Sequence, residues 1–156
     1  MNVLNSDHRL VQLRFKPLWL YVDQVREFCS FFASATFDDH GMGERISIVV
    51  HELVENAIRH GDERELELSM ERTPGVVVVR VSNTTSDDGA HKLREAFDEM
   101  NALPAEQAYA AAIERSISLP EGQSGLGLSR VRHEGRVELV LEAGQGRVSI
   151  SARGEL

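Results

Sequence analysis

Three polar residues, Glu52, Asn56 and His60, recur at every fourth position in the stretch HELVENAIRHG, which also has a good apolar face. On a helical wheel at about 100° per residue, Asn56 lies at the edge of the apolar arc, Glu52 lies one step further out, and His60 falls within the arc. An amide at the margin of a core costs on the order of 1 to 3 kcal/mol unless it finds polar partners. The stripe is therefore either a core boundary satisfied by water and backbone, or one wall of a polar site.

A second stretch, EGQSGLGLSRV, has the composition of a phosphate-binding loop. Gly122, Gly125 and Gly127 surround Ser124 just before an expected short helix. Glycines let the backbone approach an anionic ligand closely, and the free amides at a helix start offer donors to phosphate oxygens. Glycine-rich turns are also common in loops without ligands, so this stretch alone does not decide between the two. It is not a Walker A loop, because no lysine follows the last glycine.

Helices and strands that alternate along the chain must position these two stretches. Strands are predicted at residues 9–15, 65–72 and 75–83, with a closing hairpin over 136–154. Helices are predicted at 18–37 after Pro17, at 44–60 after a break at 38–43, at 91–103 and at 104–116, with Gly61 ending the second helix. This order predicts an α/β (α+β) two-layer sandwich, with a mixed, mostly antiparallel sheet covered by helices on one face.

Composition limits the classes of protein that this chain can belong to. It has 156 residues, 42% of them hydrophobic, which suits one domain over residues 1–156. Its net charge of -8 opposes binding to nucleic acid or to an anionic membrane. No long apolar run or secretory signal is present, so a cytoplasmic protein is expected. Cys29 is the only cysteine and lies among apolar residues, which predicts a buried thiol.

Taken in order, the motifs resemble a known family. A helix with E-x-x-x-N-A-x-x-H-G, a strand ending in a polar residue, a variable insert and G-L-G-L at a helix start are similar to the Bergerat ATP-binding fold of the GHKL proteins. Sensor histidine kinases, type II topoisomerases, MutL and anti-sigma factor kinases share this fold. The chain length resembles that of the stand-alone serine/threonine kinases of the RsbW and SpoIIAB type. The two-helix insert, at about 84–121, most resembles that of SiaB-type protein kinases.

The resemblance implies a role for each matched residue at an ATP site. It implies that Glu52 activates the attacking hydroxyl or water, and that Asn56 holds Mg²⁺ through its side-chain oxygen. One helical turn places both groups on the same flank, where they can address one γ-phosphate. The loop expected to wrap the phosphates of ATP consists of Ser124, Gly125, Leu126 and Gly127.

Two matched positions carry a less defined role. His60 is expected at the nucleotide site, where it either forms a hydrogen bond or caps the end of the helix. Asn83 stands where the family places the aspartate that accepts the adenine amino proton, and its amide oxygen can accept without a full negative charge. A shifted register that uses Asp87 and Gly89 would recover part of the usual motif, but it places the acid four residues past the strand end.

The resemblance implies an ATP- and Mg²⁺-dependent protein serine/threonine kinase of a bacterial partner-switching system. Its expected substrate is a small STAS-domain-like antagonist protein. A sigma factor or a phosphatase as a further partner, and a homodimer, remain open. The alternative from another class is a nucleotide-binding adaptor without kinase activity, which sequesters its partner by binding alone.

Two other patterns carry weaker chemistry. HELVE resembles the zincin helix H-E-x-x-H, but Glu55 replaces the second histidine and breaks the motif. SRVRHEGR gathers four basic residues beside the glycine loop, where they could steer a nucleotide or dock an acidic partner: Arg130, Arg132, His133 and Arg136. Solvated charge on a short helix is the favoured interpretation of this run.

Overall fold

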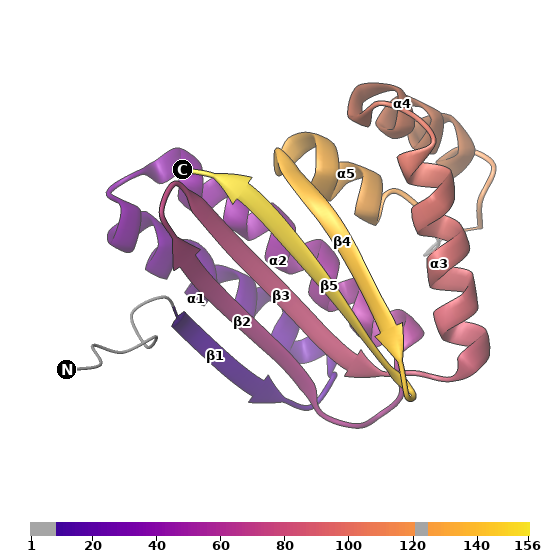
Figure 1. Ribbon diagram of the computed structural model, residues 1–156, viewed down its shortest axis with the longest axis horizontal. Helices are drawn as coiled ribbons and strands as arrows, with labels where there is room; N and C mark the ends of the chain where they lie inside the picture. Colours follow the sequence, from indigo (N-terminus) through magenta and orange to yellow (C-terminus); the bar gives the residue numbers. More distant parts are fainter. Residues whose placement is uncertain (1–8, 121–124) are drawn as a thin grey trace.

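Five strands form one sheet in the order β1-β2-β3-β5-β4 (Figure 1). The computed structural model describes residues 9–120 and 125–156. The strands are β1 (Arg9–Phe15), β2 (Leu66–Thr73), β3 (Val76–Thr84), β4 (Val137–Gly144) and β5 (Arg147–Glu155). All the pairings in this order are antiparallel, so the prediction of a mixed sheet was wrong. The reason is that β5 lies between β3 and β4 and runs antiparallel to both.

Helices cover one face of this sheet, and the two helices of the insert lie beyond its edge (Figure 1). The helices are the 3₁₀ turn η1 (Trp19–Tyr21), α1 (Val22–Phe37), α2 (His40–His60), α3 (Asp87–Asn101), α4 (Ala105–Ser116) and α5 (Gly127–Glu134). Figure 1 shows α1, α2 and α5 behind the sheet, with α3 and α4 beyond the edge formed by β4. The predicted two-layer sandwich with helices on one face is confirmed.

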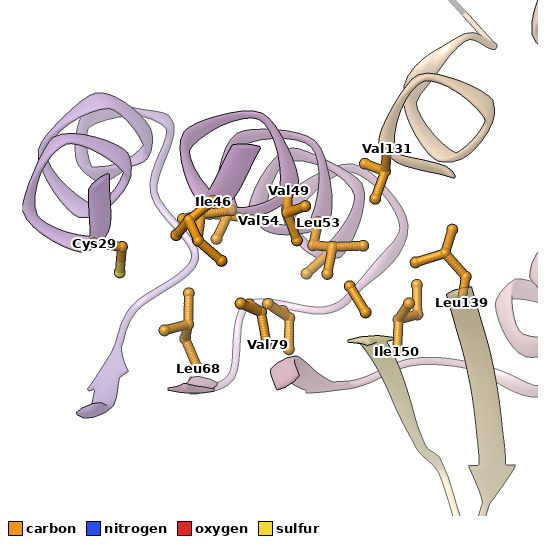
Figure 2. Close-up of a cluster of buried hydrophobic side chains, with 14 of the residues drawn as sticks. Cys29, Ile46, Val49, Leu53, Val54, Leu68, Val79, Val131, Leu139 and Ile150 are labelled. Atoms are coloured by element: carbon orange, nitrogen blue, oxygen red, sulfur yellow. The ribbon is translucent and has the colours of Figure 1, made fainter. Parts of the chain in front are cut away.

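Alternate side chains of the strands build the core. Val77, Val79 and Val81 are buried along β3, and the fully buried Leu53 of α2 meets this layer (Figure 2). The opposite face of the sheet carries mostly polar side chains, such as Glu67, Arg80 and Ser151, as two-residue periodicity requires when only one face is covered. Cys29 is fully buried in α1, and burial raises the pKa of its thiol to about 12. The prediction of a buried thiol is confirmed.

Helix α2, which carries the polar stripe, begins four residues before its predicted start. The side chain of Asp39 accepts a hydrogen bond from the backbone N–H of Gly41 at 2.8 Å and caps the helix. Gly43 was interpreted as part of a chain break, but it is a packing residue between α1 and α2. A Cβ atom there would lie 1.8 Å from Ser34 Oγ and 2.9 Å from the carbonyl oxygen of Ser30.

The close approach at Gly43 predicts a marked loss of stability in Gly43→Ala. Because the carbonyl oxygen of Ser30 is backbone, the helices must separate to admit the methyl group, and overpacking of this kind costs about 1–3 kcal/mol. Urea unfolding measures the change. Gly144→Ala is the matched control, since a Cβ atom there meets nothing within 4 Å. Equal stability of the two variants would contradict the packing role of Gly43.

Helix α2 ends at the predicted glycine. The backbone N–H of Gly61 donates to the carbonyl oxygen of Ala57 at 2.9 Å. The backbone of Gly61 is extended rather than left-handed, so the need for glycine is steric. A Cβ atom would lie 2.3 Å from Asn83 Nδ2 and 2.4 Å from the carbonyl oxygen of Ala57. The end of β3 therefore packs directly against the end of α2.

The described part of the insert between β3 and α5 contains two helices, as predicted. Helix α3 begins at Asp87 rather than at residue 91, because the side chain of Ser86 caps it by accepting from the backbone N–H of Gly89 at 3.1 Å. Three buried side chains hold α3 against the rest of the chain: Leu93, Phe97 and Met100. The described part of the insert is thus packed structure.

Candidate functional site

A cavity of about 360 Å³ lies between α2, the insert helices α3 and α4, and the first turn of α5. Its size falls within the range of small-molecule sites. Glu52, Asn56 and His60 line it from α2, and Gly125 and Gly127 line it from the glycine loop. The structure therefore brings together the two stretches that sequence analysis singled out.

Glu52 and Asn56 occupy different settings on this wall. Glu52 is 9% exposed, and its Oε1 accepts a hydrogen bond from Arg130 Nη1 at 3.0 Å. Asn56 is half-buried, and its amide makes no hydrogen bond to another described residue. An amide that faces a cavity without a protein partner is free to bind water, a metal ion or a ligand. The polar stripe is therefore one wall of a cavity and not only the margin of the core.

His60 is exposed, although the helical wheel places it within the apolar arc of α2. The last turn of the helix faces the cavity instead of the core. Partial desolvation of the imidazole, together with the positive charges of Arg59 and Lys92, lowers the pKa of His60. The ring is consequently neutral at pH 7. The backbone carbonyl of His60 accepts a hydrogen bond from Thr85 Oγ1 at 2.8 Å, which ties the end of α2 to the start of the insert.

The glycine loop meets the polar stripe at Gly127. A Cβ atom on Gly127 would lie 2.9 Å from Glu52 Oε2, so a side chain there would displace the carboxylate of Glu52. Gly125 has a left-handed φ of 57°, which also favours glycine. Leu126, the N-cap residue of α5, is half-buried and is not part of the cavity wall. No side chain of the described residues caps α5, which leaves amides of its first turn available for other partners. Ser124 lies outside the described residues.

Asn83 lies apart from the cavity wall. It is 7% exposed at the end of β3, its Nδ2 donates to the carbonyl oxygen of Thr84 at 3.1 Å, and it packs on Gly61. Beside it, Thr84 Oγ1 donates a hydrogen bond to the carboxylate of Asp62. The role of Asn83 in adenine binding therefore stays a prediction, without support from the shape of this cavity.

Three cationic side chains line the cavity that sequence analysis did not assign to it. Arg59 comes from α2, Lys92 from α3 and Arg115 from α4. Lys92 also pairs with Asp88 at 2.8 Å, and Arg115 pairs with Glu99 at 3.5 Å, both on the exposed surface. Exposed pairs of this kind contribute little to stability, so these cations can turn to an anionic ligand at small cost. No spacing within the insert indicates which of its faces meets α2.

The charged residues of α5 are engaged with the protein, so their interpretation as solvated charge was wrong. Arg130 bridges Glu52 and Glu134, with its Nε 2.9 Å from Glu134 Oε2. Arg132 Nη1 donates to the carbonyl oxygens of Met100 and Leu103, each at 2.8 Å, and thereby fastens the end of α3 to α5. The i,i+4 spacing of Arg130 and Glu134 was the one signal in the sequence for these contacts.

The zincin-like pattern gains no support from the structure. His51 Nε2 and Glu55 Oε1 form a pair at 3.7 Å on α2. Within the part of the chain that the structure describes, no group of three or more His, Cys, Asp or Glu side chains could hold a metal ion. A magnesium ion shared between Asn56 and the phosphates of a nucleotide would not require such a group.

The arrangement of the chain is that of the Bergerat-type fold: an antiparallel sheet, helices on one face, and a cavity between a long helix and a glycine loop. A solved structure has the same fold. It is a chain in the crystal structure of the SiaB–SiaC complex from Pseudomonas aeruginosa, with a TM-score of 0.69 and 16% sequence identity over 96% of this chain and 92% of that one. At this identity the likeness establishes the fold alone.

Comparisons by sequence give no match: no protein-family model and no curated protein matches the chain. Among residues 9–120 and 125–156, no helix combines the length and the apolar character needed to cross a membrane.

Proposed function

We propose that the chain is an ATP-dependent protein serine/threonine kinase of a partner-switching system. The observation that carries the proposal is that Glu52 and Asn56, one turn apart on α2, face one cavity with the uncapped start of α5. The cations Arg59, Lys92 and Arg115 around the same cavity suit a polyphosphate. The donor set therefore fits Mg-ATP at its phosphate end.

Each residue of the site would have a separate role in the reaction. The amides of the glycine loop would bind phosphate oxygens, and the amide oxygen of Asn56 would hold Mg²⁺. The metal supplies charge neutralisation at the transferred phosphate. Glu52 would accept the proton of the attacking serine or threonine hydroxyl. As this proton leaves, the hydroxyl oxygen forms a bond to the γ-phosphorus, and the bond between the γ-phosphorus and the leaving ADP oxygen breaks. His60, which lines the same cavity, would be a hydrogen-bonding group beside the phosphates.

A small partner protein of the STAS-like kind is the proposed substrate. The solved structure with the same fold is that of a complex between two proteins, SiaB and SiaC. This supports a regulatory role for the present protein that involves binding to a partner protein. A sigma factor or a phosphatase as a further partner follows from the family resemblance only, and the cytoplasmic location remains a prediction from the sequence.

The second candidate is a nucleotide-binding adaptor without kinase activity. Two observations favour it: Arg130 holds the carboxylate of Glu52, and Asn83 lies away from the cavity where the family has an adenine-binding aspartate. Transfer of phosphate from labelled ATP to the partner separates the two candidates. An unmodified partner that nonetheless binds in the presence of nucleotide would favour the adaptor.

Binding of Mg-ATP is the first test of either function. Because a ligand that binds only the folded state stabilises it by about 2.7 kcal/mol at 100 times its Kd, the Tm should rise. For a chain of this size the rise is roughly 5–10 °C. Differential scanning calorimetry with ATP and Mg²⁺, and with ATP and EDTA as the control, measures it. Titration calorimetry that detects no ATP or ADP binding at millimolar concentration with Mg²⁺ present would remove both candidates.

A further inference from the structure

Helix α4 of the insert is connected to Glu52 by a continuous chain of polar contacts. Tyr109 of α4 donates its hydroxyl to Glu134 Oε1 at 2.7 Å. The other oxygen of Glu134 accepts from Arg130 Nε at 2.9 Å, and Arg130 Nη1 donates to Glu52 Oε1 at 3.0 Å. These hydrogen bonds run from the insert through α5 to the wall of the cavity. We call the four side chains that form them the contact chain.

Each member is held well enough to transmit a displacement. The ring of Tyr109 stacks on His133 with centroids 4.9 Å apart, which fixes the direction of its hydroxyl. The bond to Glu134, together with desolvation, raises the pKa of Tyr109, so the hydroxyl keeps its proton and remains a donor at neutral pH. The guanidinium of Arg130 is planar and presents its donors in a fixed fork. A movement of Glu134 therefore turns the donor that binds Glu52.

The contact with Arg130 sets the orientation of Glu52. Its Oε1 is held by Arg130, while its Oε2 lies on the side of Gly127, where the glycine loop closes the cavity. The side chain of Glu52 is 10% exposed and that of Arg130 is 40% exposed, so the bond is shielded from water at the carboxylate end. A carboxylate with one oxygen fixed presents the other oxygen in a defined direction.

We propose that Arg130 is a positioning residue for Glu52, and that helix α4 controls it through Tyr109 and Glu134. The insert then acts on the reacting carboxylate as well as covering the cavity: a nucleotide or partner that displaces α4 changes the direction of Glu52. This inference rests on the proposed kinase function for its effect on rate, whereas the contact chain itself is tested without any activity.

The first test follows the Nε–H signal of Arg130 by NMR in the protein without nucleotide. Tyr109→Phe removes only the hydroxyl and keeps the ring on His133. Loss of a hydrogen bond worth about 0.5–1.5 kcal/mol should speed solvent exchange of this N–H by roughly 2- to 10-fold. Glu52→Gln should also shift the signal. Tyr21→Phe, at the only other tyrosine, and Glu44→Gln, at an exposed position of α2, are the matched controls. If neither Tyr109→Phe nor Glu52→Gln changes the exchange rate or the position of the Arg130 Nε–H signal, the proposal is wrong, whether or not the protein is a kinase.

The second test is kinetic. Arg130→Met should lower kcat about 10-fold or more, since a hydrogen bond to a charged group is lost, while KM for ATP changes less than about twofold. Arg130→Lys should restore part of kcat, and Tyr109→Phe should lower it by a smaller factor than Arg130→Met does. If Arg130→Met lowers only the Tm and leaves kcat intact, Arg130 is structural and the proposal fails. If the parent protein binds Mg-ATP but transfers no phosphate, the proposed kinase function is wrong. The NMR experiment then still tests whether the contact chain exists, because it does not depend on activity.

Discussion

Glu52→Gln is expected to reduce phosphoryl transfer by about 10²- to 10⁴-fold, the usual range when a general base is lost, while Mg-ATP binding survives. Glutamine keeps the shape of the side chain, and its carbonyl oxygen can still accept the hydrogen bond from Arg130. It cannot take up the proton of the attacking hydroxyl. The measurement is phosphate transfer from labelled ATP to the partner, beside a nucleotide titration of the same sample.

Glu44→Gln provides the control for this experiment. Glu44 lies on the same helix, is exposed, and is absent from the cavity wall, so the same chemical change there should leave transfer unaltered. Transfer by Glu52→Gln at the rate of the parent protein would exclude Glu52 as the base. Loss of nucleotide binding together with transfer would point instead to a disturbed cavity, because Gly127 and Arg130 both pack on this side chain.

Helix α2 shows what periodicity can predict. Its apolar spacing placed Leu53 and Ala57 in the core, where the structure has them, and it isolated Glu52 and Asn56 as polar residues that needed partners. The partners of Glu52 and Asn56 could not be predicted in the same way. Arg130 is 78 residues away from Glu52, and no local pattern records a contact at that separation.

Glycines account for the main error in the element boundaries. Gly41 and Gly43 have the composition of a loop, yet both lie within α2. Gly43 is required because α1 packs so closely that a methyl group would meet Ser34 and the backbone of Ser30. A requirement set by another helix is invisible in the local sequence, which records only that glycine is a poor helix former.

The charged residues near the site were the least predictable part. Arg130 and Arg132 were attributed to solvent because most runs of charge are solvated. Arg130 instead pairs with Glu52 and Glu134, and the insert supplies Arg132 with two backbone carbonyl oxygens. The direction in which α3 and α4 pack is a tertiary property. For the same reason Lys92 and Arg115, on different helices, could not be assigned to one cavity before the structure was known.

Asn56→Ala is expected to lose most of the Mg²⁺-dependent affinity for ATP without loss of stability. The amide of Asn56 makes no hydrogen bond to another described residue, and alanine favours a helix more than asparagine does, so the Tm of the variant without ligand should be equal or slightly higher. Removal of even an outer-shell partner of a metal typically costs 10- to 100-fold in affinity, so loss of a ligand should cost at least about 10-fold here.

Titration calorimetry of the Asn56→Ala variant with ATP, once with Mg²⁺ and once with EDTA, separates the metal from the nucleotide. The affinity in EDTA should change little, because the phosphates would still meet the glycine loop and the cations of the insert. Asn101→Ala, an exposed position at the end of α3, is the matched control and should bind as the parent protein does. If Asn56→Ala binds Mg-ATP as tightly as the parent, Asn56 is not a metal ligand. The free amide on the cavity wall then has to be explained by water or by a different ligand.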